Sequence, residues 1–302
     1  MRNLFIYIIG VLLLAACGES YEEKRRITRA EQIRLTKADS AALKVGVTPT
    51  LDCMPVFLAK EHHLFDTLGV DIRPKLFTAH LDIQDRLEKG KLEAGFTDLV
   101  RAERMMKRGT PLYYVTATNT YWQFITNRKS RIKELRQLTD KMVAMTNHSV
   151  TDMLAQMCVD SVKLKQTDVF RVPINDVYVR LSMLQNNEMD AMLMTEPQAT
   201  TARLYKNPVL MDTRKIDLRM GAIVMRERVM SDQNRKKQLD AFVKAYNMAC
   251  DSLNMNGWER YKDIMMKYIQ MDDKTYQALP KLKFEHAQTP RQKDIDRAKR
   301  FL

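Results

Sequence analysis

The sequence predicts an α/β fold of two lobes, in which each lobe is a mostly parallel sheet flanked by helices. From Leu43 onward, short apolar runs alternate with segments of helix length, which is typical of a parallel sheet covered by helices. The order of these runs recurs with an offset of 97 residues when Lys44 is laid on Lys141. With 302 residues, 45% of them hydrophobic, the chain can fill two buried cores.

Four apolar runs predict the strands of the first lobe, and the offset predicts four more in the second. The runs of the first lobe are 44–48, 70–77, 92–97 and 112–115. Their counterparts are 141–145, 167–174, 189–194 and 209–212. Apolar residues at helical spacing predict helices between the first four strands, around 54–64, around 83–87 and through Met105. Few identical residues accompany the offset, so similar spacing in an unrelated α/β protein remains an alternative explanation.

The chain beyond Thr213 has no counterpart in this repeat. A strand-like run at 222–225 is followed by helical patterns at 231–253 and 258–269. The simplest arrangement has the chain crossing to the second lobe near 119–123 and returning near 213–220. This arrangement divides the chain into three parts: 43–119 and 214–302 in lobe 1, and 120–213 in lobe 2.

The N-terminal segment predicts export. Residues 1–16 carry one charge, Arg2, before an apolar run from Leu4 to Ala16 that is shorter than the roughly 20 residues a membrane-spanning helix needs. The stretch from Leu14 to Gly18 resembles the lipobox of bacterial lipoproteins, which implies removal of the signal peptide before Cys17 and lipidation of its thiol. Residues 17–42 would then be a tether that anchors the protein to a membrane of the bacterial cell envelope. An ordinary signal peptide with an incidental cysteine is the alternative.

Composition limits the partners and cofactors. Fifty Lys and Arg against 37 Asp and Glu give a net charge of +13, which favours anionic ligands or acidic membrane surfaces, although a basic solvated surface is the simpler explanation. In an exported protein we expect no nucleic acid partner. Cys53, Cys158 and Cys250 have no Cys-x-x-Cys spacing, so we expect buried free thiols. The five His are scattered, and seven of the 21 Met are expected on the core faces of strands or helices, so we expect no metal and no cofactor; the seven are Met142, Met145, Met153, Met157, Met189, Met192 and Met194.

Several motifs occur in a fixed order along the repeat. Residues 57–65, Phe-Leu-Ala-Lys-Glu-His-His-Leu-Phe, and 89–95, Lys-Gly-Lys-Leu-Glu-Ala-Gly, lie in the first lobe. Residues 187–191, Asn-Glu-Met-Asp-Ala, lead into Thr-Glu-Pro at 195–197 in the second. These motifs resemble those of type II periplasmic binding proteins, among them the nitrate, sulfonate and thiamine-precursor binding proteins of ABC importers. The resemblance covers about residues 43–225.

This resemblance implies a solute-binding lipoprotein and no enzyme. A small polar ligand would be captured in an interlobe cleft and delivered to ABC permease and ATPase subunits, and we expect the protein to be a monomer. Two departures keep the ligand class open. Asn187 stands where the family usually has Gly, and residues 147–152, Asn-His-Ser-Val-Thr-Asp, replace a glycine-rich loop.

Ligand-binding candidates follow from the position of the strand ends. In open parallel sheets, ligands bind at the carboxyl ends of the strands, so both lobes should present these ends to one cleft. The candidates are Thr50, Asp52, Thr78, His80, Thr97, Asp98, Asn119, Trp122, Asn147, Ser149, Thr151, Asn175 and Glu196.

The chemistry of these candidates favours a ligand that donates hydrogen bonds. Asp52, Asp98 and Glu196 would suit a cation, an amine or an aminopyrimidine, whereas a sulfonate would call for Arg or Lys. Trp122 is expected to stack on a planar ligand beside the hinge. Ser149 has the position of a helix cap, where free N–H groups could bind an anion unless the Asp152 carboxylate already occupies them.

Two other functions remain open. One is a solute-sensing or scaffolding lipoprotein with a vestigial cleft. The other is an enzyme related to the thiamine pyrimidine synthase, which would need a cysteine-rich iron-binding motif and a Lys carrying pyridoxal phosphate. No clustered cysteines occur in the sequence, which weighs against the enzyme.

Overall fold

A computed structural model describes residues 29–257 and 259–302. The predicted signal peptide, the lipidation site Cys17 and the start of the tether lie outside the described residues. The rest of the tether contains helix α2 (Arg29–Ala41), which belongs to a separate unit from the compact body of Leu43–Leu302. No described helix has the length and hydropathy needed to cross a bilayer.

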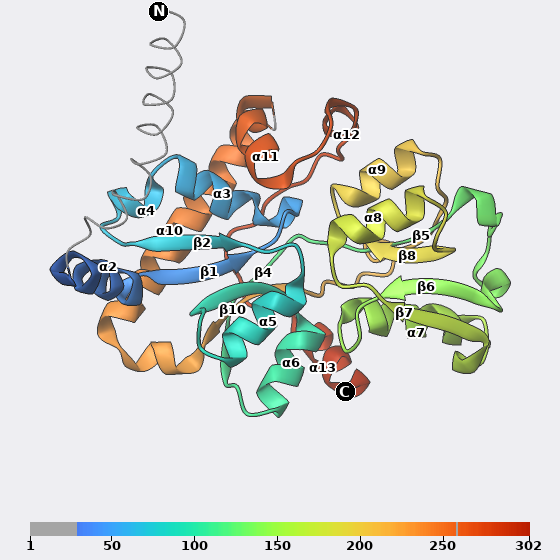
Figure 1. Ribbon diagram of the computed structural model, residues 1–302, viewed down its shortest axis with the longest axis horizontal. Helices are drawn as coiled ribbons and strands as arrows, with labels where there is room; N and C mark the ends of the chain where they lie inside the picture. The colour runs from blue at the N-terminus through green and yellow to red at the C-terminus, as the bar shows by residue number, and fades with distance from the viewer. Residues whose placement is uncertain (1–28, 258) are drawn as a thin grey trace, which may run out of the picture. The chain divides into compact units, whose positions relative to one another are not determined.

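The first sheet has five strands in the order β2-β1-β3-β10-β4 (Figure 1). Its strands are β1 (Leu43–Val47), β2 (Ile72–Leu76), β3 (Ala94–Asp98), β4 (Leu112–Ala117) and β10 (Gly221–Arg226). Strands β2 and β3 pair with β1 in parallel, whereas β10 is antiparallel to both of its neighbours, β3 and β4. The mostly parallel sheet predicted from the sequence is therefore confirmed. We call this sheet and the helices packed on it the first lobe.

The second sheet repeats this order as β7-β6-β8-β5-β9. Its strands are β5 (Gln123–Thr126), β6 (Lys141–Met145), β7 (Val169–Pro173), β8 (Ala191–Met194) and β9 (Val209–Asp212). Strands β2, β3 and β4 begin 97 residues before β7, β8 and β9, which confirms the predicted repeat of elements. Strand β5 was not predicted, because its four residues continue the apolar stretch of the crossover without a turn signal. We call this sheet with its helices the second lobe.

Helices cover both sheets. The first lobe carries α3 (Met54–Glu61), α4 (Leu64–Thr67), α5 (His80–Glu88), α6 (Leu99–Lys107), α10 (Gln233–Asn256), α11 (Lys262–Ile269) and α13 (Gln292–Phe301). The second lobe carries α7 (Val150–Ser161), α8 (Val177–Gln185) and α9 (Gln198–Leu204), and α12 (Asp273–Gln277) packs against α9. Helix α10 packs on α3, whereas α13 packs on α6, and Figure 1 shows these two pairs on opposite sides of the first sheet.

The apolar core of the first lobe has two layers, one on each face of its sheet. Successive residues of a strand point to opposite faces, so Ile223 of β10 packs with α3 and α10, whereas Val224 packs with α5 and α6. Helix α5 lies very close to the sheet at Gly95, where an added Cβ would come within 2.5 Å of the Ile83 side chain. A glycine is therefore required at this point of β3.

A third apolar cluster lies mainly in the second lobe and contains Trp122. The Trp122 side chain is only 6% exposed and belongs to the same cluster as Phe124, Val143 and Leu154. The expected stacking of Trp122 on a ligand is therefore corrected: its large apolar ring fills the core at the start of β5. Cys158 lies in this cluster and Cys53 and Cys250 in the first lobe, and all three are buried free thiols, as expected.

We expect Trp122→Ala to destabilise the fold rather than act on ligand affinity alone. Removing a buried aromatic ring costs about 3–5 kcal/mol in unfolding free energy because the remaining cavity does not fully collapse. Thermal and urea unfolding of the full-length protein would measure this. The control is Tyr205→Ala, which removes an aromatic ring that is 57% exposed and should change stability little. A Trp122→Ala protein with wild-type stability would contradict this placement.

Candidate functional site

The carboxyl ends of the strands in the two lobes meet and touch directly. The Leu51 N–H after β1 donates to the Glu196 carbonyl after β8, at 3.1 Å. The Val177 N–H at the start of α8 donates to the Thr78 carbonyl after β2, also at 3.1 Å. The cleft predicted from topology therefore exists as a contact surface between strand ends. A cavity of about 10 Å³, roughly the room of one water molecule, lies within it between Asp52 and Glu196.

Asp52 is the acid of this cavity that lacks a cationic partner. Its Oδ1 accepts a hydrogen bond from Thr50 Oγ1 at 2.6 Å, and its Oδ2 accepts one from Thr118 Oγ1 at 3.0 Å. Among the described residues, no Lys, Arg or His forms an ion pair with it. Burial raises the pKa of the Asp52 carboxyl, and the two hydroxyl groups lower it by less. An ionised Asp52 is therefore costly until a donor or a cation reaches it.

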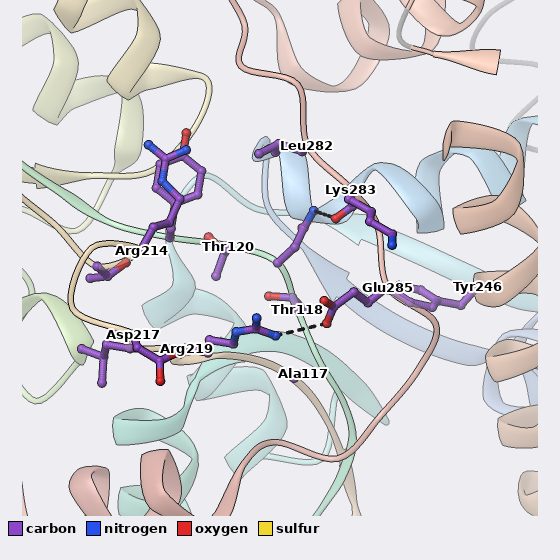
Figure 2. Close-up of a pocket in the computed structure, with 14 residues that line it drawn as sticks. Ala117, Thr118, Thr120, Arg214, Asp217, Arg219, Tyr246, Leu282, Lys283 and Glu285 are labelled. Carbon is purple, nitrogen blue, oxygen red and sulfur yellow. Dashed lines mark hydrogen bonds and ion pairs between the residues drawn. The ribbon is translucent and has the colours of Figure 1, made fainter. Parts of the chain in front are cut away.

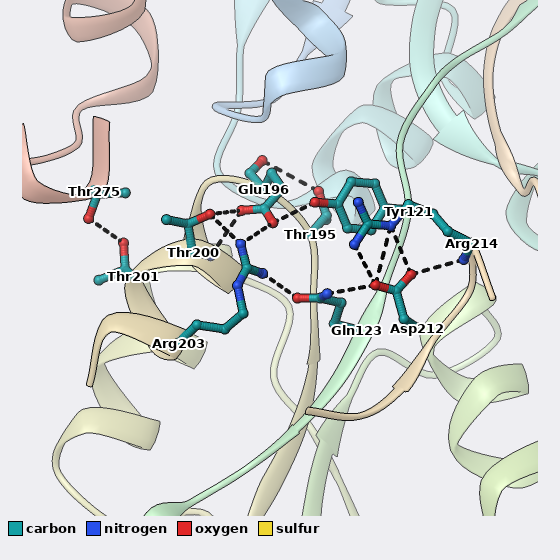
Figure 3. Close-up of polar contacts among 10 residues, drawn as sticks. All are labelled: Tyr121, Gln123, Thr195, Glu196, Thr200, Thr201, Arg203, Asp212, Arg214 and Thr275. Carbon is teal, nitrogen blue, oxygen red and sulfur yellow. Dashed lines mark hydrogen bonds and ion pairs between the residues drawn. The ribbon is translucent and has the colours of Figure 1, made fainter. Parts of the chain in front are cut away.

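Glu196, in contrast, is fully partnered (Figure 3). Its Oε1 accepts from Tyr121 Oη at 2.6 Å and forms an ion pair with Arg203 Nη2 at 2.8 Å. Its Oε2 accepts from the N–H and the hydroxyl of Thr200, at 2.9 Å and 2.6 Å. The Arg214 guanidinium lies 3.8 Å from the centroid of the Tyr121 ring. This network fixes Tyr121 as the aromatic side chain that faces the cavity.

Asp98 is also paired, with groups from both lobes. Within the first lobe, its Oδ2 accepts from Arg101 Nε at 3.0 Å and its Oδ1 accepts from the Arg101 N–H at 3.0 Å, so that it caps α6. From the second lobe, the Val150 N–H at the start of α7 donates to the same Oδ1 at 3.0 Å. Burial raises the pKa of the Asp98 carboxyl, and the adjacent Arg101 opposes this shift.

A second buried guanidinium lies near this pair. Arg180 of α8 donates to the carbonyls of Ile174 and Leu193, at 2.6 Å and 3.0 Å, and to the Thr146 hydroxyl. Burial lowers the pKa of Arg180, and so does the neighbouring Arg101. Burial and these two guanidinium groups lower the pKa of His80 to about 3, so its imidazole is neutral at physiological pH.

Ser149 caps α7, as the sequence predicted. Its Oγ accepts from the Thr151 N–H at 3.1 Å, and the Thr151 hydroxyl in turn accepts from the Thr146 N–H at 2.9 Å. Asp152 accepts from the His148 N–H and pairs with Arg171 instead of occupying the end of the helix. The first N–H of α7, that of Val150, is left to Asp98.

The remaining candidates lie around the same contact surface. Thr97 is buried, and its hydroxyl has no hydrogen-bond partner among the described residues. Asn119 lines the Asp52 cavity and donates to the Lys283 carbonyl at 3.1 Å. Asn147 and Asn175 line a separate open groove together with α5 residues such as Asp82.

A larger cavity of about 260 Å³ lies where both crossovers meet the C-terminal segment (Figure 2). Arg219 pairs there with Glu285 at 3.2 Å. The cavity shares four wall residues with the Asp52 cavity: Asn119, Thr120, Tyr121 and Leu282. The two cavities are therefore neighbours around the first crossover.

Among the residues that sequence reasoning missed are three partners of the predicted acids, Arg101, Tyr121 and Arg203, and the nearby buried Arg180. Arg101 follows Asp98 by three residues and Arg203 follows Glu196 by seven, which is helical spacing, so these two could have been found. Tyr121 and Arg180 contact the site through the tertiary fold, and no local pattern indicates them. No cluster of three metal-ligating side chains occurs within residues 29–257 and 259–302.

The sequence and the fold were compared with known protein families and solved structures. A model of the NMT1-like family matches residues 36–265. No curated protein matches the sequence significantly. A solved structure from Bordetella bronchiseptica RB50 has a TM-score of 0.74 at 14% identity, and the alignment covers 86% of this chain and 88% of that one.

Two further solved structures carry names that describe a ligand. The alkanesulfonate-binding protein SsuA from Xanthomonas axonopodis pv. citri, bound to MOPS, has a TM-score of 0.70 at 16% identity and covers 86% of this chain and 90% of its own. The periplasmic nitrate-binding protein NrtA from Synechocystis PCC 6803 has a TM-score of 0.64 at 16% identity, with coverage of 78% and 68%. Because the family model spans most of the chain and the two-lobed fold matches, the chain belongs to the NMT1-like family and has the fold of SsuA- and NrtA-type periplasmic substrate-binding proteins.

Proposed function

We propose that this protein captures a small polar solute between its two lobes and delivers it to an ABC importer. Membership of the NMT1-like family supports this, as do a structural neighbour named as the ligand-binding component of an ABC-type import system and one named as an alkanesulfonate-binding protein. Ligand contacts to both lobes would stabilise the closed arrangement by differential affinity, with the hinge at the two crossovers near 119–123 and 213–220. The structural neighbours are binding proteins, so we propose that the chain has no catalytic activity.

The observation that indicates the class of ligand is the Asp52 carboxylate, which has no cationic partner among the described residues. Asp98 and Glu196 already have guanidinium partners, whereas Asp52 has only hydroxyl donors. A cation or a hydrogen-bond donor such as an amine or an aminopyrimidine would offset the cost of burying this charge. We therefore propose Asp52 as the anchor of the ligand, with Thr50, Asn119 and Glu196 around it. The other candidates at the strand ends would complete the cleft.

The N-terminal motif supports a membrane-anchored form of this receptor. A thiol lipidated at Cys17 would attach the lobes to a membrane of the cell envelope through residues 17–42. We propose that this anchored receptor acts as a monomer next to its permease and ATPase.

The direct contacts between strand ends favour a second candidate function. A sensing or scaffolding lipoprotein would need no ligand space, and the interlobe cavity at Asp52 holds only about 10 Å³. The two functions differ in whether the protein retains a solute.

The first experiment is mass spectrometry of small molecules released by denaturing the full-length protein purified in mild detergent. We expect a stoichiometric amine-bearing compound from wild type and its loss from Asp52→Asn, because the amide cannot balance a cationic charge. Asp71→Asn, which changes an exposed carboxylate at the amino end of β2, is the matched control. If wild type releases no compound, and no amine or aminopyrimidine shifts its melting temperature, the sensing or scaffolding function is favoured.

Asp52→Asn should also remove a pH dependence of stability whose direction is set by the raised pKa of Asp52. Because the folded-state pKa of Asp52 lies above its unfolded value of 3.8, this group's contribution to stability is full below about pH 4 and is lost as pH rises through the folded pKa. Asn stays neutral, so the variant should melt at a higher temperature than wild type at pH 7, by about 2–4 °C for each kcal/mol. The difference should vanish near pH 4. A variant that is less stable than wild type at pH 7 would show that burial of the ionised Asp52 carboxylate does not destabilise the folded protein.

Lipidation can be tested by fractionating cells of a bacterial host that express wild type or Cys17→Ser. We expect wild type in the membrane fraction and the variant released from it, because a lipid chain contributes about 0.8 kcal/mol per buried CH₂ group to membrane binding. Mass spectrometry of the N-terminal peptide should show acyl chains on Cys17. An unmodified wild-type cysteine would favour an ordinary signal peptide.

A further inference from the structure

Asp98 is a carboxylate that both lobes use at the same time. It lies at the carboxyl end of β3 and caps α6 through the Arg101 N–H, at 3.0 Å. The same oxygen atom accepts the Val150 N–H of the opposite lobe, also at 3.0 Å. Its other oxygen pairs with the Arg101 guanidinium, and both side chains are less than 10% exposed. A single buried carboxylate therefore joins a guanidinium of one lobe to a helix N-terminus of the other.

These two groups are the ones that a small oxyanion would use. Helix α7 has 12 residues, so its N-terminus carries a substantial partial positive charge, and its first N–H groups have no carbonyl partner within the helix. A guanidinium forms charge-assisted hydrogen bonds with sulfonate, nitrate or phosphonate oxygens. With Ser149 bound to the Thr151 N–H, the Val150 N–H is the donor directed at Asp98. In this protein the carboxylate of Asp98 takes the position that a ligand oxyanion would need.

The charges around Asp98 show what its carboxylate balances. Arg101 and Arg180 are both buried, Arg101 lowers the pKa of Arg180, and His80 is neutral. Arg180 donates hydrogen bonds to carbonyl and hydroxyl oxygens and has Asp176 as its nearby carboxylate, whereas Asp98 forms the ion pair with Arg101. Removal of Asp98 would leave the buried Arg101 and the α7 N-terminus without their carboxylate.

We infer that Asp98 determines the ligand charge of this cleft: its carboxylate is an internal substitute for an oxyanion and excludes small oxyanions from the α7 N-terminus. The solutes named for the structural neighbours, alkanesulfonate and nitrate, are oxyanions, and by this inference the present chain does not accept them. The inference deepens the proposed function and rests on it, because it concerns the same cleft. It agrees with the donor-type ligand that Asp52 favours.

The test compares wild type, Asp98→Ser and Asp98→Asn as full-length proteins in mild detergent. Sulfate, methanesulfonate and nitrate are titrated at constant ionic strength, with chloride as the reference anion, and binding is measured by calorimetry and thermal shift. Serine is a good helix cap and should keep the hydrogen bond from the Arg101 N–H while removing the carboxylate. We expect at least about tenfold tighter oxyanion binding for Asp98→Ser than for wild type, equivalent to about 1.4 kcal/mol.

Asp98→Asn removes the negative charge of the side chain but leaves an oxygen in contact with the Val150 N–H. Its amide oxygen can still accept the Val150 N–H but carries no charge, so its thermal shift with sulfate should lie between those of wild type and Asp98→Ser. The control is Asp232→Ala, which removes a carboxylate cap from α10 with no contact to the other lobe and should leave the anion response unchanged. If Asp98→Ser does not fold, the comparison of Asp98→Asn with wild type decides.

One result would overturn the inference: folded Asp98 variants that bind sulfate no more tightly than wild type does. Because the probes are simple anions, this test does not require the natural solute. If no compound co-purifies but Asp98→Ser binds sulfate more tightly than wild type, only the proposed function is contradicted. If a compound co-purifies but Asp98→Ser shows no such gain, only the role of Asp98 is contradicted.

Discussion

Burial of carboxylates at the ends of parallel strands is the constraint on which this site depends. An ionised group removed from water must find charged or hydrogen-bonding partners, or its proton affinity rises. The three acids meet this requirement in different ways. Glu196 has an arginine of its own lobe, Asp98 has an arginine and the amide of the other lobe, and Asp52 has only hydroxyl groups. The incomplete partnering of Asp52 is the reason why we propose a cation or a hydrogen-bond donor as the ligand.

The same requirement links electrostatics to the relative position of the lobes. Separation of the strand ends would expose Asp98 to water and would leave the α7 N-terminus without its carboxylate. Backbone contacts at Leu51 and Val177 would be lost in the same movement. A ligand that opens and recloses the cleft must therefore supply interactions worth more than these internal ones.

The regular parts of this fold could be predicted because they depend on local periodicity. Apolar runs gave nine of the ten described strands, eight of them related by the offset between Lys44 and Lys141, and the capping role of Ser149 followed from its spacing to Asp152. Strand β5 was not predicted because its four residues continue the apolar stretch of the crossover without a turn signal. The candidate acids could be placed at strand ends by topology, but their pairing could not be predicted. The contact from Val150 to Asp98 joins residues 52 positions apart, and no local pattern encodes it.

The sequence alone could also not predict which of two neighbouring aromatic side chains faces the cavity. Trp122 and Tyr121 are neighbours in the sequence, and the rarity of tryptophan favoured Trp122 as the ligand contact. Alternation along an extended chain directs adjacent side chains to opposite sides, so one enters the core and the other faces the cavity. The register of β5 with β8 and β9 decides which of the two side chains enters the core.

The position of β10 within the first sheet has a consequence for the order in which the protein folds. Strand β10 lies between β3 and β4, yet it is synthesised after the whole second lobe. The first sheet therefore cannot close until residue 226 has emerged, so its folding depends on contacts far apart in the sequence, a topology that favours slow folding.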